Sequence, residues 1–152
     1  VRKLYEDNLK YVKHDYFALP EKLQGKGFSK EMFRIWHQQY LNTKIDKIKV
    51  HANLDVGGYT WAKYGFKPYE VKQMAQFFDK AKNLHTNKLI SDDEYNDFLN
   101  IVEESEDGLL DLNNIANTVY GKKILLESSW FGEIDLNDKH YKSIYETYLF
   151  GK

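Results

Sequence analysis

A glycine-bearing turn that leads into an amphipathic segment is the first place where the sequence could do chemistry. It covers residues 23–30, Leu-Gln-Gly-Lys-Gly-Phe-Ser-Lys. A turn that opens a helix points backbone N–H groups outward, and the helix start adds partial positive charge. Glycine leaves room for a phosphate beside the backbone. We therefore predict a pyrophosphate cradle, with an ordinary turn as the alternative, because neither the P-loop nor the dinucleotide spacing is present. The cradle residues are Gln24, Gly25, Lys26, Gly27, Phe28, Ser29 and Lys30.

A second stretch, HANLDVGGYTWAKYGF, covers residues 51–66 and carries a histidine and two tyrosines. It predicts a short helix over 55–64, capped by Asp55 and ended by a left-handed Gly65. Gly57 and Gly58 lie near the start of this helix, although each glycine costs roughly 1 kcal/mol relative to alanine in a helix interior. We expect that a side chain there would obstruct either a ligand or the packing of the helix on a strand.

The elements that must position these residues follow one another closely. The apolar run 16–19 predicts a buried strand, and residues 30–41 predict an amphipathic helix. Alternation of apolar and polar residues over 47–52 predicts a strand with one buried face. The helix therefore crosses over between two strands that we expect to be parallel neighbours. Residues 1–13 fit a helix or a strand equally well.

The rest of the chain predicts mostly helices. One begins near Tyr69, a capping box over residues 91–94 opens a second, and Asp111 caps a third that runs to Tyr120. Residues 122–136 hold two strand-like pieces, ILLE and FGEIDL, and a last helix follows. We predict one α+β domain over 1–152 with a mixed sheet. Its parts are a cofactor-binding core over 14–66, a helical segment over 67–120, and strands with a C-terminal helix over 121–152.

Composition narrows the classes of function. The 152 residues have a net charge of −1 and no cysteine. The charge gives no general attraction to nucleic acid or an anionic membrane, and the missing cysteines exclude disulfides and thiolate metal sites. The acidic groups around 92–94 and 103–107 lack calcium-loop spacing, so we expect no metal. We expect a soluble, cytoplasmic protein. The chain begins with valine, which is compatible with a processed product or a piece of a larger polypeptide.

Over residues 14–66 the chain resembles the GNAT family of acyl-CoA-dependent N-acetyltransferases. In that family a glycine pattern between a strand and a helix holds the pyrophosphate of coenzyme A. Gly25 and Gly27 match its glycines, whereas its Arg/Gln position falls on Lys22. The family's later asparagine and Gly-Phe landmarks match Asn53 and residues 65–66. The resemblance implies a GNAT-like core and acetyl-CoA as co-substrate.

The resemblance also implies the roles of individual residues in acetyl transfer to an amine on a small molecule or a protein. A backbone N–H near Phe17, Ala18 and Leu19 would hold the thioester carbonyl. Trp61 stands where the family often has a tyrosine that protonates the leaving thiolate, so the candidates for that role are Tyr59 and Tyr64. A base must take the proton of the amine. The candidate bases are Asp15, His14 and His51.

Two other functions remain open. The first is a non-catalytic interaction or structural domain of a larger, toxin- or phage-associated protein or assembly, which the departures at Lys22 and Trp61 favour. The second is a toxin domain that acts on a nucleotide or tRNA. Its footprint would be a stripe of lysines, which is more often a solvated face: Lys22, Lys26, Lys30, Lys47 and Lys49.

Overall fold

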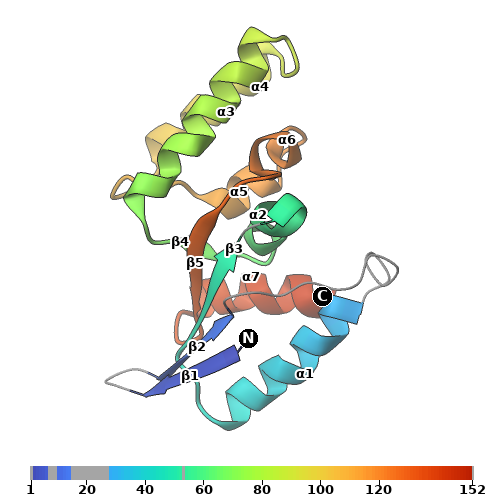
Figure 1. Cartoon of the computed structure of the whole chain (residues 1–152), viewed down its shortest axis with the longest axis vertical. Coiled ribbons are helices and arrows are strands. Elements are labelled where there is room, and N and C mark those ends of the chain that lie inside the picture. Colours follow the sequence, from blue (N-terminus) through green and yellow to red (C-terminus); the bar gives the residue numbers. More distant parts are fainter. Residues whose placement is uncertain (1, 7–9, 15–27, 53, 152) are drawn as a thin grey trace. The chain divides into compact units, whose positions relative to one another are not determined.

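The chain folds as an α+β protein with a mixed sheet (Figure 1). The computed structural model describes residues 2–6, 10–14, 28–52 and 54–151. Within these ranges the sheet has the strand order β1-β2-β3-β5-β4. The strands are β1 (Arg2–Glu6), β2 (Lys10–His14), β3 (Lys47–Ala52), β4 (Lys67–Pro68) and β5 (Trp130–Asp135).

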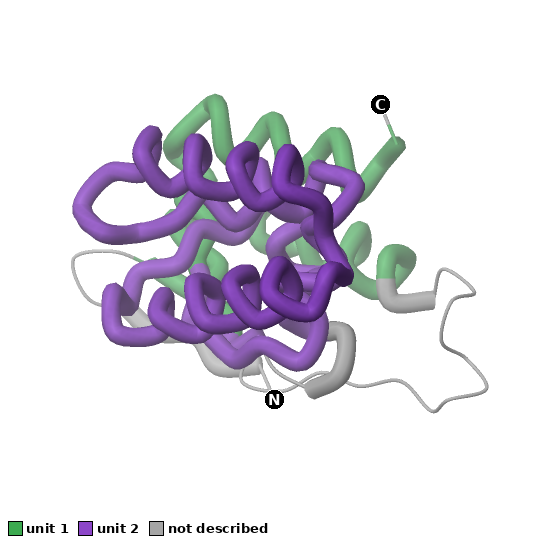
Figure 2. Tube along the Cα trace, turned by 90° about the horizontal axis from the view of Figure 1, so that it is seen from above, with its two compact units in different colours: residues 1–50, 133–152 green, residues 51–132 purple. Residues whose placement is uncertain are grey.

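Helices make up most of the remaining described chain. They are α1 (Phe28–Asn42), α2 (Leu54–Lys63), the 3-10 helix η2 (Val71–Met74), α3 (Ala75–Thr86), α4 (Asp92–Glu104), α5 (Leu112–Ala116), α6 (Gly121–Leu125) and α7 (Lys139–Phe150). The chain divides into two compact units (Figure 2). Unit 1 comprises residues 1–50 and 133–152, and unit 2 comprises residues 51–132.

In unit 1 the first two strands pair with each other. β1 pairs with β2 in antiparallel register, with Leu4 opposite Val12. β2 then pairs in parallel with β3, and α1 lies between these two strands in the chain. A helix does cross over between two parallel neighbours, but the partner of β3 is β2, not the predicted strand over 16–19. The predicted strand over 16–19 lies outside the described residues.

Helix α1 packs on α7 in unit 1. The buried face of α1 carries Phe33, His37 and Tyr40, which fall at i, i+4 and i+7. Tyr145 and Leu149 are the buried residues of α7, and the Arg34 Nε donates to the Leu149 carbonyl oxygen at 2.8 Å. The predicted helix over 30–41 is confirmed.

In unit 2, helices α3 and α4 lie side by side as a hairpin (Figure 1). The rings of Phe78 and Phe98 meet edge to face between them, 6.1 Å apart. The predicted capping box at the start of α4 is confirmed. The Ser91 hydroxyl accepts from the Glu94 N–H at 3.1 Å, and the Glu94 carboxylate accepts from the Ser91 N–H at 2.8 Å.

Two predictions for residues 111–127 are wrong. Asp111 does cap α5, but this helix ends at Ala116 and does not reach Tyr120. The piece ILLE was predicted as a strand, whereas the chain forms the short helix α6 there. A short apolar run does not by itself distinguish a strand from a buried helical turn. FGEIDL does lie largely in β5, where Trp130, Gly132 and Ile134 alternate on the buried face.

The glycine pair in α2 has a packing explanation at one of its two positions. A Cβ at Gly58 would lie 2.8 Å from the Leu125 carbonyl oxygen and 3.0 Å from that of Ser128, and would also collide with the Ser128 hydroxyl. Gly58 therefore lets α2 approach the backbone that connects α6 to β5. A Cβ at Gly57 would meet only the Ala52 carbonyl carbon, at 3.8 Å. Helix α2 begins at Leu54, so Asp55 lies inside it rather than at its cap.

Candidate functional site

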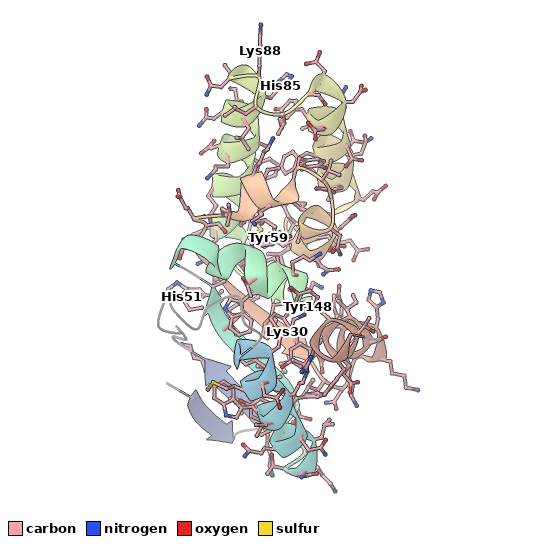
Figure 3. All side chains as sticks on the ribbon, turned by 90° about the vertical axis from the view of Figure 1, so that its right-hand side faces the viewer. Lys30, His51, Tyr59, His85, Lys88 and Tyr148 are labelled. Atoms are coloured by element: carbon pink, nitrogen blue, oxygen red, sulfur yellow. The ribbon has the colours of Figure 1, made fainter. Side chains whose placement is uncertain are left out.

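A serine and a histidine that are far apart in the sequence meet on unit 2. The Nε2 of His51, near the end of β3, lies 3.0 Å from the Oγ of Ser129, which directly precedes β5. Ser129 is exposed and His51 is half-buried, so both side chains are within reach of solvent. Figure 3 labels His51 at the end of its strand. A hydroxyl in hydrogen-bond contact with an imidazole is the arrangement from which a base can activate a nucleophile.

The backbone of Ser129 is held by a glutamine from α3. The Gln76 Oε1 accepts from the Ser129 N–H at 3.0 Å, and the Gln76 Nε2 donates to the Ser129 carbonyl oxygen at 2.6 Å. Gln73 continues the pattern, since its Oε1 accepts from the Phe131 N–H at 2.7 Å. These amides satisfy backbone groups at the start of β5 in the way that a neighbouring strand would. Gln76 thus bonds only the backbone of Ser129, and the Ser129 hydroxyl hydrogen-bonds to the imidazole of His51.

The imidazole of His51 is positioned by strand alternation and by a ring contact. Val50 and Ala52 are buried, so His51 points to the other face of β3. There its ring packs on that of Phe131, with centroids 4.6 Å apart. The Tyr69 ring stacks on Phe131 in turn, at 6.2 Å. The pair thus lies beside a wall of two aromatic rings.

The neighbouring serine has a different environment. Ser128 is 5% exposed, and its hydroxyl donates to the Leu125 carbonyl oxygen at 2.6 Å. It fixes the turn that leads from α6 into β5. Glu127, with φ of 62°, adopts the left-handed backbone conformation in that turn. Of the two adjacent hydroxyls, only that of Ser129 faces a possible base.

The structure separates the two candidate tyrosines. Tyr64 is 1% exposed and packs among aromatic rings, 5.7 Å from Trp61. Tyr59 is half-exposed, with the Nζ of Lys122 at 5.7 Å from its ring centroid. Figure 3 labels Tyr59 on α2. Gly65, directly after Tyr64, has φ of 94°, which confirms the predicted left-handed end of α2.

Most of the predicted cofactor-binding residues lie outside the described part of the chain. These residues are Phe17, Ala18, Leu19, Gln24, Gly25, Lys26, Gly27 and Asn53, and the candidate base Asp15 lies outside it as well. Phe28, Ser29 and Lys30 form the first turn of α1, and His14 ends β2. The Lys30 Nζ lies 4.1 Å from the centroid of the Tyr148 ring, a cation–π contact within unit 1 (Figure 3).

Lys47 and Lys49 of β3, which belong to the lysine stripe proposed for nucleic-acid binding, lie close to an acidic side chain. In unit 1 the Glu133 carboxylate lies 3.3 Å from the Lys47 Nζ and 3.9 Å from that of Lys49. The Lys49 Nζ also lies 4.5 Å from the Tyr11 ring centroid. One carboxylate therefore offsets part of the positive charge of these two lysines.

Unit 1 buries another histidine. His37 is 1% exposed, and its Nε2 lies 3.2 Å from the Glu146 carboxylate, while its Nδ1 has no hydrogen-bond partner among the described residues. Burial lowers the pKa of His37 below 6.5, against the raising effect of Glu146. Glu146 also lines a hollow of about 500 Å³ along α7. None of these residues was predicted as part of a site.

Within the described ranges, no cluster of three or more histidine or acidic side chains could hold a metal ion, and no helix is long and apolar enough to cross a membrane.

Sequence reasoning named His51 as a candidate base but did not connect it to Ser129. The two residues are separated by 78 positions, and the intervening contacts through Gln76 and Phe131 carry no local signature. Comparisons with known proteins found no matching family model, no matching curated protein and no matching solved structure.

Proposed function

We propose that this protein is an acyl-CoA-dependent N-acyltransferase that transfers an acetyl group from acetyl-CoA to an amine on a small molecule or a protein. The observation that carries the proposal is the order of elements around β3. A parallel pair, β2 and β3, is joined through α1, and β3 leads into α2, which ends at the left-handed Gly65. This is the order that the GNAT resemblance implies for a cofactor-binding core.

The proposal gives His51 the role of general base. It lies near the end of β3, is accessible to solvent, and is held by Ser129 and Phe131. A base must be within hydrogen-bond reach of the proton that it removes, which requires an exposed ring of fixed orientation. Tyr59 is the better candidate for protonating the leaving thiolate, because it is half-exposed whereas Tyr64 is 1% exposed. The backbone around Gly25 and Gly27 would hold the pyrophosphate.

Isothermal titration with coenzyme A tests the cofactor. We expect binding at submillimolar to millimolar concentration, and loss of it when Gly25 and Gly27 are both replaced by valine, because the added side chains would occupy the space of a phosphate. Gly151→Ala, beyond the end of α7, is the matched glycine control and should bind as the wild type does. An unchanged melting temperature shows that the double variant is folded. No heat of binding at millimolar coenzyme A would contradict the proposal and favour the non-catalytic domain.

A further inference from the structure

We propose that Ser129 and His51 form a nucleophile–base pair that accepts an acyl group covalently and hydrolyses small activated esters or thioesters. This activity goes beyond transfer to an external amine, since the first acyl acceptor is a hydroxyl of the protein itself. This activity does not use the predicted coenzyme A residues at 17–30. Its side chains, Ser129 and His51, both belong to unit 2, which comprises residues 51–132.

The geometry of the hydroxyl carries the proposal. The Ser129 Oγ lies 3.0 Å from the His51 Nε2, within the range in which an imidazole can accept a hydroxyl proton. Gln76 bonds both the N–H and the carbonyl oxygen of Ser129, so the position of its Cα is fixed from two sides. The serine is exposed, and an acyl carbonyl can therefore approach Oγ.

Ser128 and Ser129 form a natural comparison within the same turn. The Ser128 hydroxyl donates to a backbone carbonyl, which occupies its proton and buries its oxygen. The Ser129 hydroxyl has a nitrogen base instead. The Ser128 hydrogen bond is sufficient to close the turn, and Gln76 already satisfies the backbone N–H of Ser129. The contact between the Ser129 hydroxyl and His51 is therefore not needed to hold the turn.

The surroundings of the pair indicate the class of substrate. The Phe131 ring packs on His51, and the Tyr69 ring stacks on Phe131, so an apolar wall stands beside the nucleophile. Such a wall suits a small apolar acyl group or an aromatic leaving group better than a charged one.

The reaction proceeds in two balanced halves. As the Ser129 Oγ forms a bond to the acyl carbon, its proton moves to the His51 Nε2. The tetrahedral intermediate then collapses, the bond to the leaving alcohol or thiol breaks, and His51 returns the proton to that group. In the second half a water molecule attacks the acyl carbon and gives a proton to His51. The bond to Oγ breaks, and Ser129 recovers its proton as the carboxylic acid leaves.

The test uses p-nitrophenyl acetate and the full chain, with no coenzyme A present. We expect a burst of one equivalent of p-nitrophenolate per chain, and peptide mass spectrometry should find one added acetyl group on Ser129. Ser129→Ala should abolish the burst without disturbing the fold, since Gln76 contacts only the backbone there. His51→Gln should slow acylation by about 10²–10⁴-fold.

Ser143→Ala is the control for loss of an exposed serine, and it should keep the wild-type burst. An acetyl group found only on lysines, or a burst that persists in Ser129→Ala, would overturn the proposal. Because no coenzyme A is used, a chain that binds coenzyme A but is not acylated at Ser129 overturns this inference alone. A chain that is acylated at Ser129 but binds no coenzyme A overturns the proposed transferase function alone.

Discussion

The two units bury polar side chains in different ways. Unit 1 buries His37, a titratable side chain with one ring nitrogen that no described residue bonds. Unit 2 buries Ser128, whose hydroxyl is bonded to the backbone and does not titrate near neutral pH. The Trp130 Nε1 in unit 2, which no described residue bonds, is likewise not titratable. Below neutral pH the stability of unit 1 should therefore depend on pH. The stability of unit 2 should depend on side-chain volume, because α2 approaches the backbone after α6 at a glycine.

The largest effect is expected for Gly58→Ala in unit 2. The new Cβ would lie 2.8 Å from the Leu125 carbonyl oxygen and 3.0 Å from that of Ser128, so α2 must move away from the backbone before β5. We expect a loss of about 1–3 kcal/mol in the free energy of unfolding, measured by urea denaturation.

Gly57→Ala is the matched control, since the new Cβ would meet only one carbon, at 3.8 Å. This variant should be neutral or more stable than the wild type, because alanine favours a helix more than glycine does. If both variants lost the same stability, helix propensity and packing at Gly58 would not explain the glycine pair.

An intermediate effect is expected for the pH dependence of unit 1. Burial lowers the pKa of His37 below 6.5, while Glu146 raises it and Lys142 lowers it. As the pH falls below 6.5, the unfolded chain binds a proton that the folded chain does not bind, so stability falls. The contribution of a single group is at most about 1.4 kcal/mol per pH unit. It ends once the pH reaches the pKa of His37 in the folded chain.

The free energy of unfolding is measured between about pH 7.5 and 5 for the wild type and for His37→Phe. This range spans the ordinary histidine pKa of about 6.5. Phenylalanine keeps a ring in the core but cannot titrate. We expect the wild type to lose more stability than the variant over this range. Equal losses would show that His37 does not produce the pH dependence.

The smallest effect is expected at the capping box in unit 2. Ser91→Ala removes the hydroxyl that accepts from the Glu94 N–H, and an N-cap of this kind contributes about 1 kcal/mol. Thermal unfolding should show a lower melting temperature. Ser143→Ala, at an exposed position inside α7, should leave it unchanged. A larger effect at Ser143 than at Ser91 would contradict the assignment.

Predictions from the sequence succeeded where a short pattern determines the structure. The spacing in α1, the alternation in β3, the capping box at Ser91 and the left-handed Gly65 are each set by neighbours within a few residues. The sequence did not predict the strands β1 and β2, because the spacing of their apolar residues fits a helix and a strand equally well. Its pairing with β3 decides between them.

The candidate site depended on contacts that no local pattern encodes. The role of His51 as a base could be suggested, but its partner Ser129 is brought to it by Gln76 on another helix. In α1 the same limit applies, because the spacing predicted a helix but not that His37 would be buried on the face that packs on α7. Packing partners from distant segments decide which face of an element is covered.

The packing of α1 on α7 has a consequence for the order in which the chain acquires its structure during synthesis. Unit 2 is one continuous segment, so all of its contacts are available once residue 132 has left the ribosome. The Arg34 Nε and the Leu149 carbonyl oxygen are 115 positions apart, so the packing of α1 on α7 forms only after α7 is made. During synthesis α1 therefore lacks its α7 partner while unit 2 can already fold, and the surface that α7 later covers is then open to chaperones and aggregation.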